Sequence, residues 1–385
     1  MQQFPPFWSD PISHLLRQQP DVPVLYLSPQ ILQATARRFR GGFPGLVTYA
    51  VKANDRPEVL DNLVAAGIDT FDVASPSEMA AARRAFPQAV LHYNNPVRSR
   101  DEVAAGIANG VASWAVDDPT ELSKLADVPK SAELAVRIAL PVKGAAYDFG
   151  AKFGATPDLA VELLRRVDQG GWHASVCFHP GTQCEDPRAW AAYITEAARI
   201  CERAGVTLAR LNVGGGFAAD RCGKVPDLNA VFSTIRAVTD RVFTARTPAL
   251  LCEPGRALVA EAFTLATRIK GMRAGGRTIY LNDGIYGGLS ELRDMGLSRR
   301  IRVIAVDGTM RQGAPIPRVV FGPTCDSLDR LPDGLVLPAD AQDGDYVLFD
   351  GLGAYSVAIS TDFNGYGLHD IVSVQRLTGN RNLPA

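Results

Sequence analysis

Residues 46–54, Leu-Val-Thr-Tyr-Ala-Val-Lys-Ala-Asn, form a short apolar run that ends in a lysine. A run of this length and composition predicts a buried strand over Leu46–Val51. Similar runs recur at Thr70–Ala74, Ala89–Tyr93, Val111–Val116, Glu133–Leu140, Ala174–Phe178, Arg210–Val213 and Ala249–Cys252. Helix-like segments lie between them. The clearest is Pro187–Ala204, whose apolar residues keep helical spacing and which Gly205 should end.

Eight strands that alternate with helices over about 210 residues predict a (β/α)8 barrel. A doubly wound open sheet is the alternative, because alternation alone does not show closure. The chemically distinctive residues favour the barrel, since they come at or just after the carboxyl ends of the strands, where barrel enzymes keep their sites. They are Lys52, Asp72, Asn94, Arg137, His179, Gly214–Gly216 and Glu253.

After about residue 260 the pattern changes to strands joined by Gly, Pro and Asp turns, which predicts a second, mainly β domain. These strands are expected at Thr264–Ile269, Thr278–Leu281, Arg300–Val306, Arg318–Val320, Asp345–Leu348 and Asp370–Gln375, with Pro23–Tyr26 as a further strand before the barrel. We therefore expect a barrel over residues 28–260 and a β-rich domain made of residues 1–27 and 261–385.

Composition excludes several classes of protein. The 385 residues include 40 basic and 41 acidic side chains, so no net positive field favours nucleic acid. Hydrophobic residues make up 46% of the chain, which excludes global disorder. No apolar stretch is long enough to span a membrane, and the first residues lack the pattern of a secretory signal. A cytoplasmic protein without a membrane partner is expected.

The six cysteines contain no CxxC pair and no zinc spacing, so we expect no metal site and reduced thiols. We interpret five of them as small buried apolar residues. The sixth, Cys325, lies in a loop with possible chemistry, Gly322-Pro-Thr-Cys-Asp-Ser-Leu-Asp329. There Asp326 is either a turn residue or a carboxylate for a cationic substrate.

Lys52 ends a strand that should be buried. Either its stem lies along the barrel rim and its amine reaches solvent, or the amine is desolvated. Burial would lower the pKa of such an amine and suit it to Schiff-base chemistry.

Two late loops suit a phosphate. Gly214, Gly215 and Gly216 follow the seventh predicted strand, where backbone N–H groups can approach an anion, although a tight turn would use the same glycines. The next loop, Glu253-Pro-Gly255-Arg256, adds a guanidinium. Glu253 would suit a protonated ring nitrogen, and the His179 ring could stack on a planar ligand. With Lys52, these groups describe a site for pyridoxal 5′-phosphate.

Nine motifs then resemble, in order, the alanine-racemase-fold (fold type III) pyridoxal-phosphate decarboxylases, a family that includes ornithine, lysine/ornithine and diaminopimelate decarboxylases. They are YAVKAN, FDVAS, KFG, FHPGTQ, GGGF, EPGR, GPTCDSLD, GAY and FNGY, and the resemblance runs from about Pro23 to about Val374. The resemblance is greatest to ornithine decarboxylase. It implies a barrel followed by a β domain, and a homodimer with shared active sites.

The resemblance also implies a role for each matching residue. Lys52 would bond covalently to the cofactor, Glu253 would pair with its ring nitrogen and His179 would stack on the ring. Cys325 would return a proton to the substrate after CO2 leaves. Phosphate would be held by Thr182, Gly214, Gly215, Gly216, Gly255, Arg256 and Tyr355, with Asp72 and Arg137 near Lys52. Lys152 would pair with Asp329 across the dimer.

The implied substrate is a basic L-amino acid, because CDS at the cysteine loop resembles ornithine and lysine/ornithine enzymes. L-Ornithine, giving putrescine for polyamine biosynthesis, is the leading expectation. The expected substrate contacts are Tyr286, Arg293, Asp294, Asp326 and Phe363. Pro180, Thr182 and Arg293 depart from the family pattern, and Arg293 could offset Asp294 or bind a substrate carboxylate. Lysine, arginine, diaminopimelate or a specialised amino acid stay open as substrates, as does a non-catalytic regulatory homologue.

Overall fold

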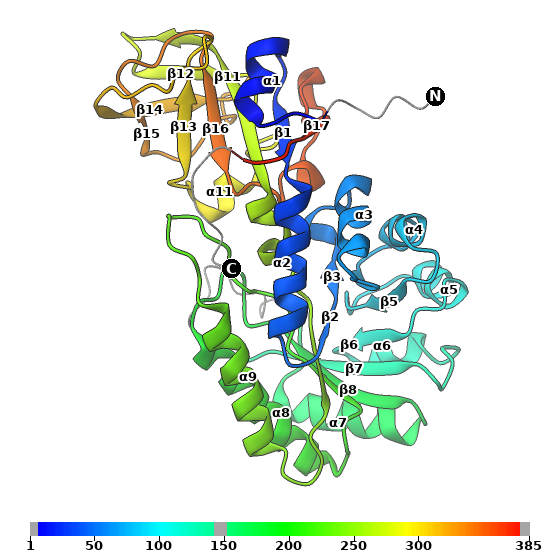
Figure 1. Ribbon diagram of the computed structural model, residues 1–385. Helices are drawn as coiled ribbons and strands as arrows, with labels where there is room; N and C mark the ends of the chain where they lie inside the picture. The colour runs from blue at the N-terminus through cyan, green and yellow to red at the C-terminus, as the bar shows by residue number, and fades with distance from the viewer. Residues whose placement is uncertain (1–6, 142–151, 378–385) are drawn as a thin grey trace. The chain divides into compact units, whose positions relative to one another are not determined.

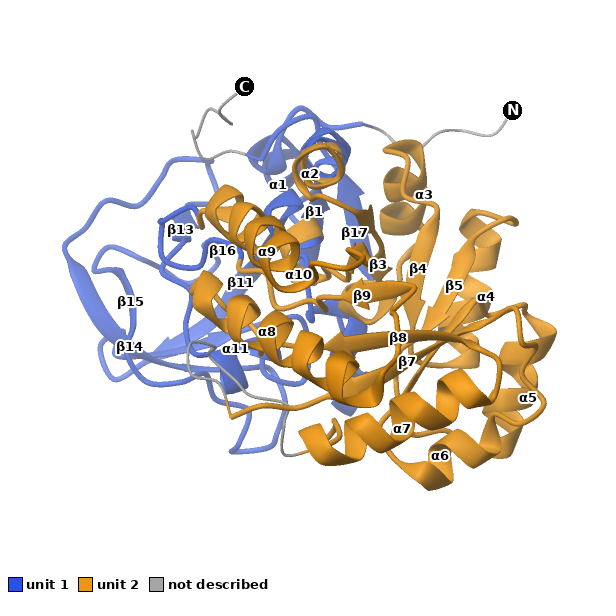
Figure 2. Cartoon of the chain, turned by 90° about the horizontal axis from the view of Figure 1, so that it is seen from below, with its two compact units in different colours: residues 1–34, 219–225, 259–385 blue, residues 35–218, 226–258 orange. Residues whose placement is uncertain are grey.

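The computed structural model describes residues 7–141 and 152–377, which divide into two compact units. Unit 1 comprises residues 1–34, 219–225 and 259–385, and unit 2 comprises residues 35–218 and 226–258 (Figure 2). Both ends of the expected β-rich domain, residues 1–6 and 378–385, lie outside the described residues.

Unit 2 contains the parallel sheet that the sequence predicts. Its strands are β2 (Leu46–Val47), β3 (Tyr49–Ala50), β4 (Thr70–Val73), β5 (Val90–Tyr93), β6 (Ser113–Val116), β7 (Glu133–Ile138), β8 (His173–Phe178), β9 (Arg210–Asn212) and β10 (Ala249–Cys252). They pair in the order β2-β10-β9-β8-β7-β6-β5-β4-β3, and the neighbours β6, β7 and β8 lie side by side in Figure 1. Each neighbouring pair is parallel, as alternation with helices requires.

The sheet closes because the first predicted strand is interrupted at Thr48. β2 pairs with β10 on one side, whereas β3 pairs with β4 on the other. Thr48 lies between them and donates from both its backbone N (3.0 Å) and its Oγ1 (3.1 Å) to the carbonyl of Cys252. The two short strands, β2 and β3, therefore connect the two edges of the sheet. This confirms the barrel and excludes the open-sheet alternative.

Helices follow the strands around the barrel. They are α2 (Pro29–Gly42), α3 (Pro57–Ala65), α4 (Pro76–Ala85), α5 (Arg100–Ala108), α6 (Pro119–Lys124), α7 (Pro157–Gln169), α8 (Pro187–Ala204), α9 (Leu228–Val242) and α10 (Arg256–Val259). The bounds of α8 confirm the prediction. Asp186 caps its amino end, Pro187 occupies the first turn, and Gly205 ends it in the left-handed conformation at φ 70°.

Unit 1 is built on a mixed sheet, with the order β13-β16-β11-β12-β14-β15, while β1 pairs with β11 and β17. Its strands are β1 (Val24–Leu27), β11 (Phe263–Arg273), β12 (Thr278–Leu281), β13 (Ile301–Ile304), β14 (Pro315–Phe321), β15 (Leu335–Pro338), β16 (Tyr346–Asp350) and β17 (Asp370–Ser373). Its helices include α1 (Pro11–Gln18) and α11 (Glu291–Met295). The sequence analysis missed α1 and β15.

The core of unit 1 lies where α1 packs on the sheet. Leu15, Val24, Ala266 and Leu348 are buried there, and the buried His14 ring bonds to the Tyr26 hydroxyl at 2.8 Å. This packing explains why residues far apart in the chain belong to one unit. Within the described residues, no helix is long and apolar enough to cross a membrane.

Four of the five cysteines expected to be small buried residues are buried, namely Cys177, Cys184, Cys201 and Cys252. Desolvation raises the pKa of each of these thiols. The expectation is wrong for Cys222, which is exposed. Cys222 lies in a turn where its backbone N donates to the Asp220 carboxylate at 3.1 Å, so its side chain is directed away from any core.

Candidate active site

The carboxyl ends of the barrel strands bring the predicted polar residues together in unit 2. Lys52 lies in a short 3-10 turn, η1 (Val51–Ala53), that follows β3, and Asp72 lies in the neighbouring strand β4. Glu253 follows β10. Burial raises the pKa of both carboxyls and the charge of Lys52 opposes that rise in each, so the three groups share one electrostatic environment.

Lys52 agrees with the first of the two alternatives, an amine that reaches solvent at the barrel rim. Its side chain is exposed, although its neighbours Val51 and Ala53 are buried. The 3-10 turn after β3 explains the difference, because the strand ends before the lysine and directs it beyond the barrel core. The amine is therefore reachable by a ligand at this end of the barrel, and it is not held inside the barrel wall.

Glu253 is the most highly connected acid of the site. Its Oε1 accepts a hydrogen bond from Asn94 Nδ2 at 2.5 Å and a second, short one from Asn212 Nδ2. Its backbone N donates to the Gly214 carbonyl at 2.8 Å. Desolvation and the charge of Asp72 raise the pKa of Glu253 to about 8. The carboxyl is thus fixed in position, and its ionisation responds to nearby charge.

His179, in the loop after β8, is a neutral ring. Its Nδ1 accepts a hydrogen bond from the backbone N of Gly181 at 3.1 Å, which places its proton on Nε2. Desolvation, Lys52 and Arg137 lower the pKa of this imidazole well below its usual value. A neutral, flat ring is suited to stacking on a planar ligand.

The glycine loop brings the ring and the acid close together. A Cβ atom at Gly215 would lie 2.7 Å from the Glu253 carbonyl oxygen and 3.2 Å from His179 Nε2. A Cβ at Gly216, where φ is 84°, would lie 2.2 Å from the carbonyl oxygen of Gly181. Any larger residue would therefore separate the two loops.

Other expected phosphate contacts of unit 2 lie in these loops. Arg256 begins α10 and is 8% exposed, and Thr182 is partly buried in the loop after β8. Gly255 lets the loop after β10 approach the Lys52 segment, since a Cβ there would lie 3.0 Å from Ala53 Cβ. The backbone at this edge therefore brings the lysine segment and the expected phosphate loops together.

Arg137 and Asp72 complete the group in unit 2. Arg137 Nη1 donates to the Asn94 carbonyl at 3.5 Å, and its guanidinium lies 5.2 Å from the centre of the Phe153 ring. Asp72 is buried, and desolvation raises its pKa against the opposing effects of Lys52, Asn94 and Arg137. Arg137 therefore supports the loop that carries Asn94.

Unit 1 holds a second group of predicted residues, in which one ring of an aromatic pair bonds to a carboxylate. The Tyr286 hydroxyl donates to Asp326 Oδ2 at 2.5 Å, and the rings of Tyr286 and Phe363 lie 5.1 Å apart. The bond from Tyr286 lowers the pKa of Asp326, with a further contribution from the backbone N–H of Leu328. Asp326 is therefore held as a carboxylate.

Asp329 anchors the cysteine loop. It is 1% exposed, and its oxygens accept from the backbone N atoms of Ile285 (3.0 Å) and Thr324 (3.1 Å). Lys152 is an exposed residue of unit 2. Its expected pairing with Asp329 across a dimer stays a prediction, and within the chain the carboxylate of Asp329 holds the loop in place.

Cys325, Asp294 and Arg293 are exposed. The backbone N of Cys325 donates to Asn364 Oδ1 at 3.1 Å. Arg293 binds both oxygens of Asp294, at 3.0 and 3.1 Å, so the structure supports the possibility that Arg293 offsets this acid. Tyr355, in unit 1, has a left-handed backbone at φ 53°, and its expected phosphate contact stays a prediction.

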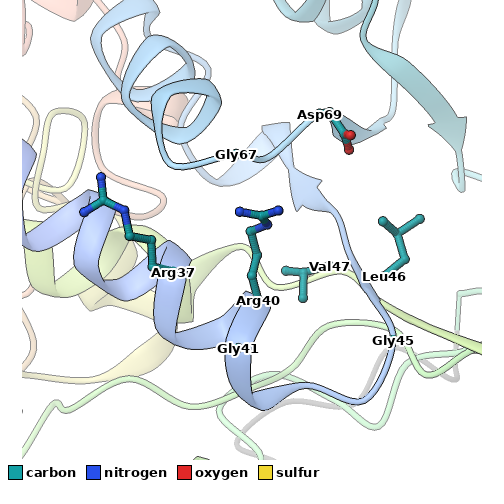
Figure 3. A pocket seen from close by; sticks show the side chains of 8 residues that line it. All are labelled: Arg37, Arg40, Gly41, Gly45, Leu46, Val47, Gly67 and Asp69. Carbon is teal, nitrogen blue, oxygen red and sulfur yellow. The ribbon is translucent and has the colours of Figure 1, made fainter.

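A pocket of about 490 Å³ lies at the other end of the barrel strands. Arg37 and Arg40 extend into it from α2, and Leu46 and Val47 of β2 line it (Figure 3). Arg40 Nη1 donates to the Ala66 carbonyl at 3.0 Å. Because this pocket adjoins the amino ends of β2 and β4, it is separate from the group around Lys52.

Sequence reasoning noted Asn94 and Asn212 at strand ends but assigned them no role. It missed Glu78 altogether. Glu78 Oε2 accepts from the backbone N of Ala74 at 2.7 Å, and burial together with Asp72 raises its pKa to about 7. The only sequence signal for Glu78 was an acid just after the FDVAS motif. That signal is not specific, because an exposed glutamate in the first turn of a helix gives the same pattern.

Comparison with known proteins identifies the family. Residues 30–260 match the family described as pyridoxal-dependent decarboxylase, pyridoxal binding domain. The chain belongs to this family. Its cofactor is pyridoxal 5′-phosphate, and it is a pyridoxal-phosphate-dependent amino-acid decarboxylase. The family resemblance inferred from the nine motifs is therefore confirmed.

Relatives of this decarboxylase act on several basic amino acids. It is 33% identical to the lysine/ornithine decarboxylase of Selenomonas ruminantium, with 84% of this chain and 81% of the relative covered. It is 31% identical to mouse ornithine decarboxylase, with 83% and 73% covered. The structure of the Paramecium bursaria Chlorella virus arginine decarboxylase bound to agmatine has a TM-score of 0.84 at 25% identity, with 94% and 98% covered.

The residues in unit 2 of this decarboxylase fit the cofactor. An amine, a fixed carboxylate, a neutral imidazole and a glycine loop lie at one edge of the barrel, and Asn94 Oδ1 is a buried acceptor without a hydrogen-bond partner among the described residues. Lys52 would hold the aldehyde carbon, Glu253 the ring nitrogen and the Gly214–Gly216 loop the phosphate. The bound cofactor supplies an electron sink for the bond that loses CO2.

Proposed function

We propose that this decarboxylase converts L-ornithine to putrescine and CO2, in polyamine biosynthesis. The observation that carries the proposal is the carboxylate of Asp326, which accepts a hydrogen bond at 2.5 Å from the hydroxyl of Tyr286, whose ring lies 5.1 Å from the exposed ring of Phe363. A carboxylate beside an aromatic ring suits a distal ammonium at the end of a short apolar chain.

The pair formed by Arg293 and Asp294 supports a substrate with one distal positive charge. Each side chain neutralises the other, which leaves Asp326 as the uncompensated carboxylate of the group. A distal carboxylate, as in diaminopimelate, would need a guanidinium that is not already engaged. The pair is about 60% exposed on both sides, so it is weak and a substrate carboxylate could compete for Arg293.

The proposed roles extend the family resemblance to the residues of this chain. Lys52, exposed at the barrel rim, would exchange places with the substrate amine on the cofactor. Glu253 would hold the ring nitrogen protonated, and neutral His179 would cover one face of the ring. Cys325, on its exposed loop, would return a proton to Cα after CO2 leaves.

Lysine, arginine and diaminopimelate are the competing substrates, because the relatives of similar identity include lysine/ornithine and arginine decarboxylases. A longer chain would keep the Asp326 contact and change only the depth of the pocket. A specialised amino acid that carries a carboxylate would instead use Arg293.

The deciding experiment measures CO2 release from L-ornithine, D-ornithine, L-lysine, L-arginine and meso-diaminopimelate by protein loaded with cofactor. A preference for L-ornithine that Asp326→Asn abolishes supports the proposal. Activity on lysine alone, or on diaminopimelate with dependence on Arg293, contradicts the ornithine assignment. Arg299→Ala is a matched control for Arg293→Ala, because Arg299 is also exposed.

We also propose a cytoplasmic homodimer with shared sites, in which Cys325 and Asp326 act on the cofactor of the partner subunit. Thiols without disulfides in the described residues support a reducing compartment. Mixing equal amounts of Lys52→Ala and Cys325→Ala subunits should restore about a quarter of the activity, because about half of the dimers are then mixed and one of the two sites in each mixed dimer is intact. Exchange of subunits without any recovery would contradict the shared site.

A further inference from the structure

Two carboxamides hold the same oxygen of Glu253. Asn94 follows β5 and Asn212 ends β9, so the donors come from different parts of the barrel. Both Nδ2 atoms donate to Oε1, and neither bond uses Oε2. The carboxylate is thereby oriented with one oxygen occupied and the other directed elsewhere.

The orientation of each amide is set by other contacts. Asn212 Oδ1 accepts from the backbone N of Gly214 at 2.9 Å, so turning this amide around would lose that bond as well as the one to Glu253. Asn94 also opposes the effect of burial on the pKa of Asp72. Asn94 therefore lies between two acids, and its Oδ1 has no hydrogen-bond partner in the described structure.

The two asparagine side chains donate to a carboxylate in a buried site, where an ionised acid is poorly solvated. Asp72 is buried and Glu253 is largely enclosed, and the charge of Asp72 disfavours ionisation of Glu253. Hydrogen bonds donated to a carboxylate favour its charged form. The bond from Asn212 and the charges of Lys52 and Arg137 oppose the effect of burial on Glu253.

We propose that Asn94 and Asn212 are positioning residues, which keep Glu253 ionised and present its Oε2 to the protonated ring nitrogen of the cofactor. Glu253 touches the cofactor in the proposed function, and the two asparagines act through it. The inference therefore rests on that assignment of Glu253. It adds a requirement for carboxamide donors at two strand ends.

Two substitutions isolate the donors. Asn94→Leu keeps a similar side-chain volume and removes the donated hydrogen bond. It costs no accepted hydrogen bond, because Asn94 Oδ1 has no partner. Asn212→Asp keeps an oxygen that can accept from Gly214, removes the donor to Glu253 and places a second carboxylate beside it, so its effect combines donor loss with charge repulsion. Asn95→Leu is the matched control, because Asn95 is adjacent, partly exposed and bonds only weakly through Oδ1 to the Val97 backbone N at 3.4 Å.

The experiment titrates apo-protein with pyridoxal phosphate and records the ¹⁵N resonance of cofactor labelled at the ring nitrogen. We expect both variants to bind the cofactor about tenfold more weakly, as one charge-assisted hydrogen bond would predict. For Asn94→Leu we also expect the ¹⁵N resonance to move toward the unprotonated form at a pH where the parent is protonated. Asn95→Leu should match the parent in both.

Parent-like affinity and ¹⁵N resonance in Asn94→Leu and Asn212→Asp would overturn the proposal. A lower unfolding temperature with an unchanged ¹⁵N resonance would also overturn it, because that result describes a packing role. A parent whose ring nitrogen is unaffected by Glu253→Gln would overturn the assignment of Glu253 itself. If either asparagine variant fails to fold, Asn94→Ala carries the same ¹⁵N test.

Discussion

The hydroxyl of Tyr286 donates a hydrogen bond to Asp326 Oδ2 at 2.5 Å, and this bond joins the segment before α11 to the cysteine loop. The bond holds Asp326 as an oriented carboxylate and lowers its pKa. Because Asp326 carries the proposed substrate contact, the phenol sets the direction in which a distal ammonium would be bound.

Tyr286→Phe should therefore raise KM for the preferred amino acid about tenfold, with a smaller change in kcat. Loss of one hydrogen bond to a charged group has this order of effect on binding. Steady-state kinetics on the preferred substrate test the prediction. Tyr280→Phe is the control, because the Tyr280 ring stacks on Phe321 at 5.6 Å within the same unit and is not assigned to the site. An unchanged KM in Tyr286→Phe would exclude this role for the phenol.

Asp329→Ala should destabilise the protein by about 2–4 kcal/mol, because it leaves the backbone N–H groups of Ile285 and Thr324 without their acceptor. Denaturant unfolding measures the change. Asp333→Ala removes an exposed carboxylate that pairs with Arg330, and it should change stability little. Equal effects of the two substitutions would contradict an anchoring role for Asp329.

Gly215→Ala should weaken cofactor binding at least tenfold, because the added Cβ would lie 2.7 Å from the Glu253 carbonyl oxygen and force the two loops apart. Fluorescence titration of the apo-protein with pyridoxal phosphate measures the affinity. Gly41→Ala adds the same methyl group where no atom lies within 4 Å, and should bind like the parent. Full affinity in Gly215→Ala would show that the loop tolerates the methyl group.

Ionisation of Asp283 should reduce stability as pH rises. Burial raises the pKa of this carboxyl from 3.8 to about 7, so the folded protein keeps a proton that the unfolded chain has already lost. The contribution of protonated Asp283 to the free energy of unfolding is fully present below about pH 4. It is lost as the pH rises through 7, and each unit by which the two pKa values differ corresponds to about 1.4 kcal/mol. Parallel unfolding curves of the parent and Asp283→Asn from pH 4 to 8 test this.

The difference in stability between Asp283→Asn and the parent should shift in favour of the variant as pH rises to 7, and then level off. Asp307→Asn is the control, since Asp307 is exposed and bonds to Thr309 with its pKa lowered. A parent and an Asp283→Asn variant that respond identically to pH would show that Asp283 ionises normally in the folded state.

The local patterns of the chain predicted most of the barrel. Short apolar runs ended at Asp72, His179 and Glu253 and placed these residues at one edge of a parallel sheet, as the structure confirms. The helix Pro187–Ala204 was predicted to the residue, because proline, apolar spacing and glycine all act within a few positions. β15 was missed, because a four-residue strand bounded by turns carries little periodic signal.

Residue types alone therefore determined the family, the barrel and the cofactor, because each depends on motifs that are contiguous in the chain. Only the tertiary structure decided that the barrel closes at Thr48, that Lys52 is exposed and that Asn94 and Asn212 meet on one oxygen of Glu253. These features depend on contacts between segments 41 to 204 residues apart. Residues so far apart in the chain form no local sequence pattern, and only packing of the closed sheet brings these groups within hydrogen-bonding distance.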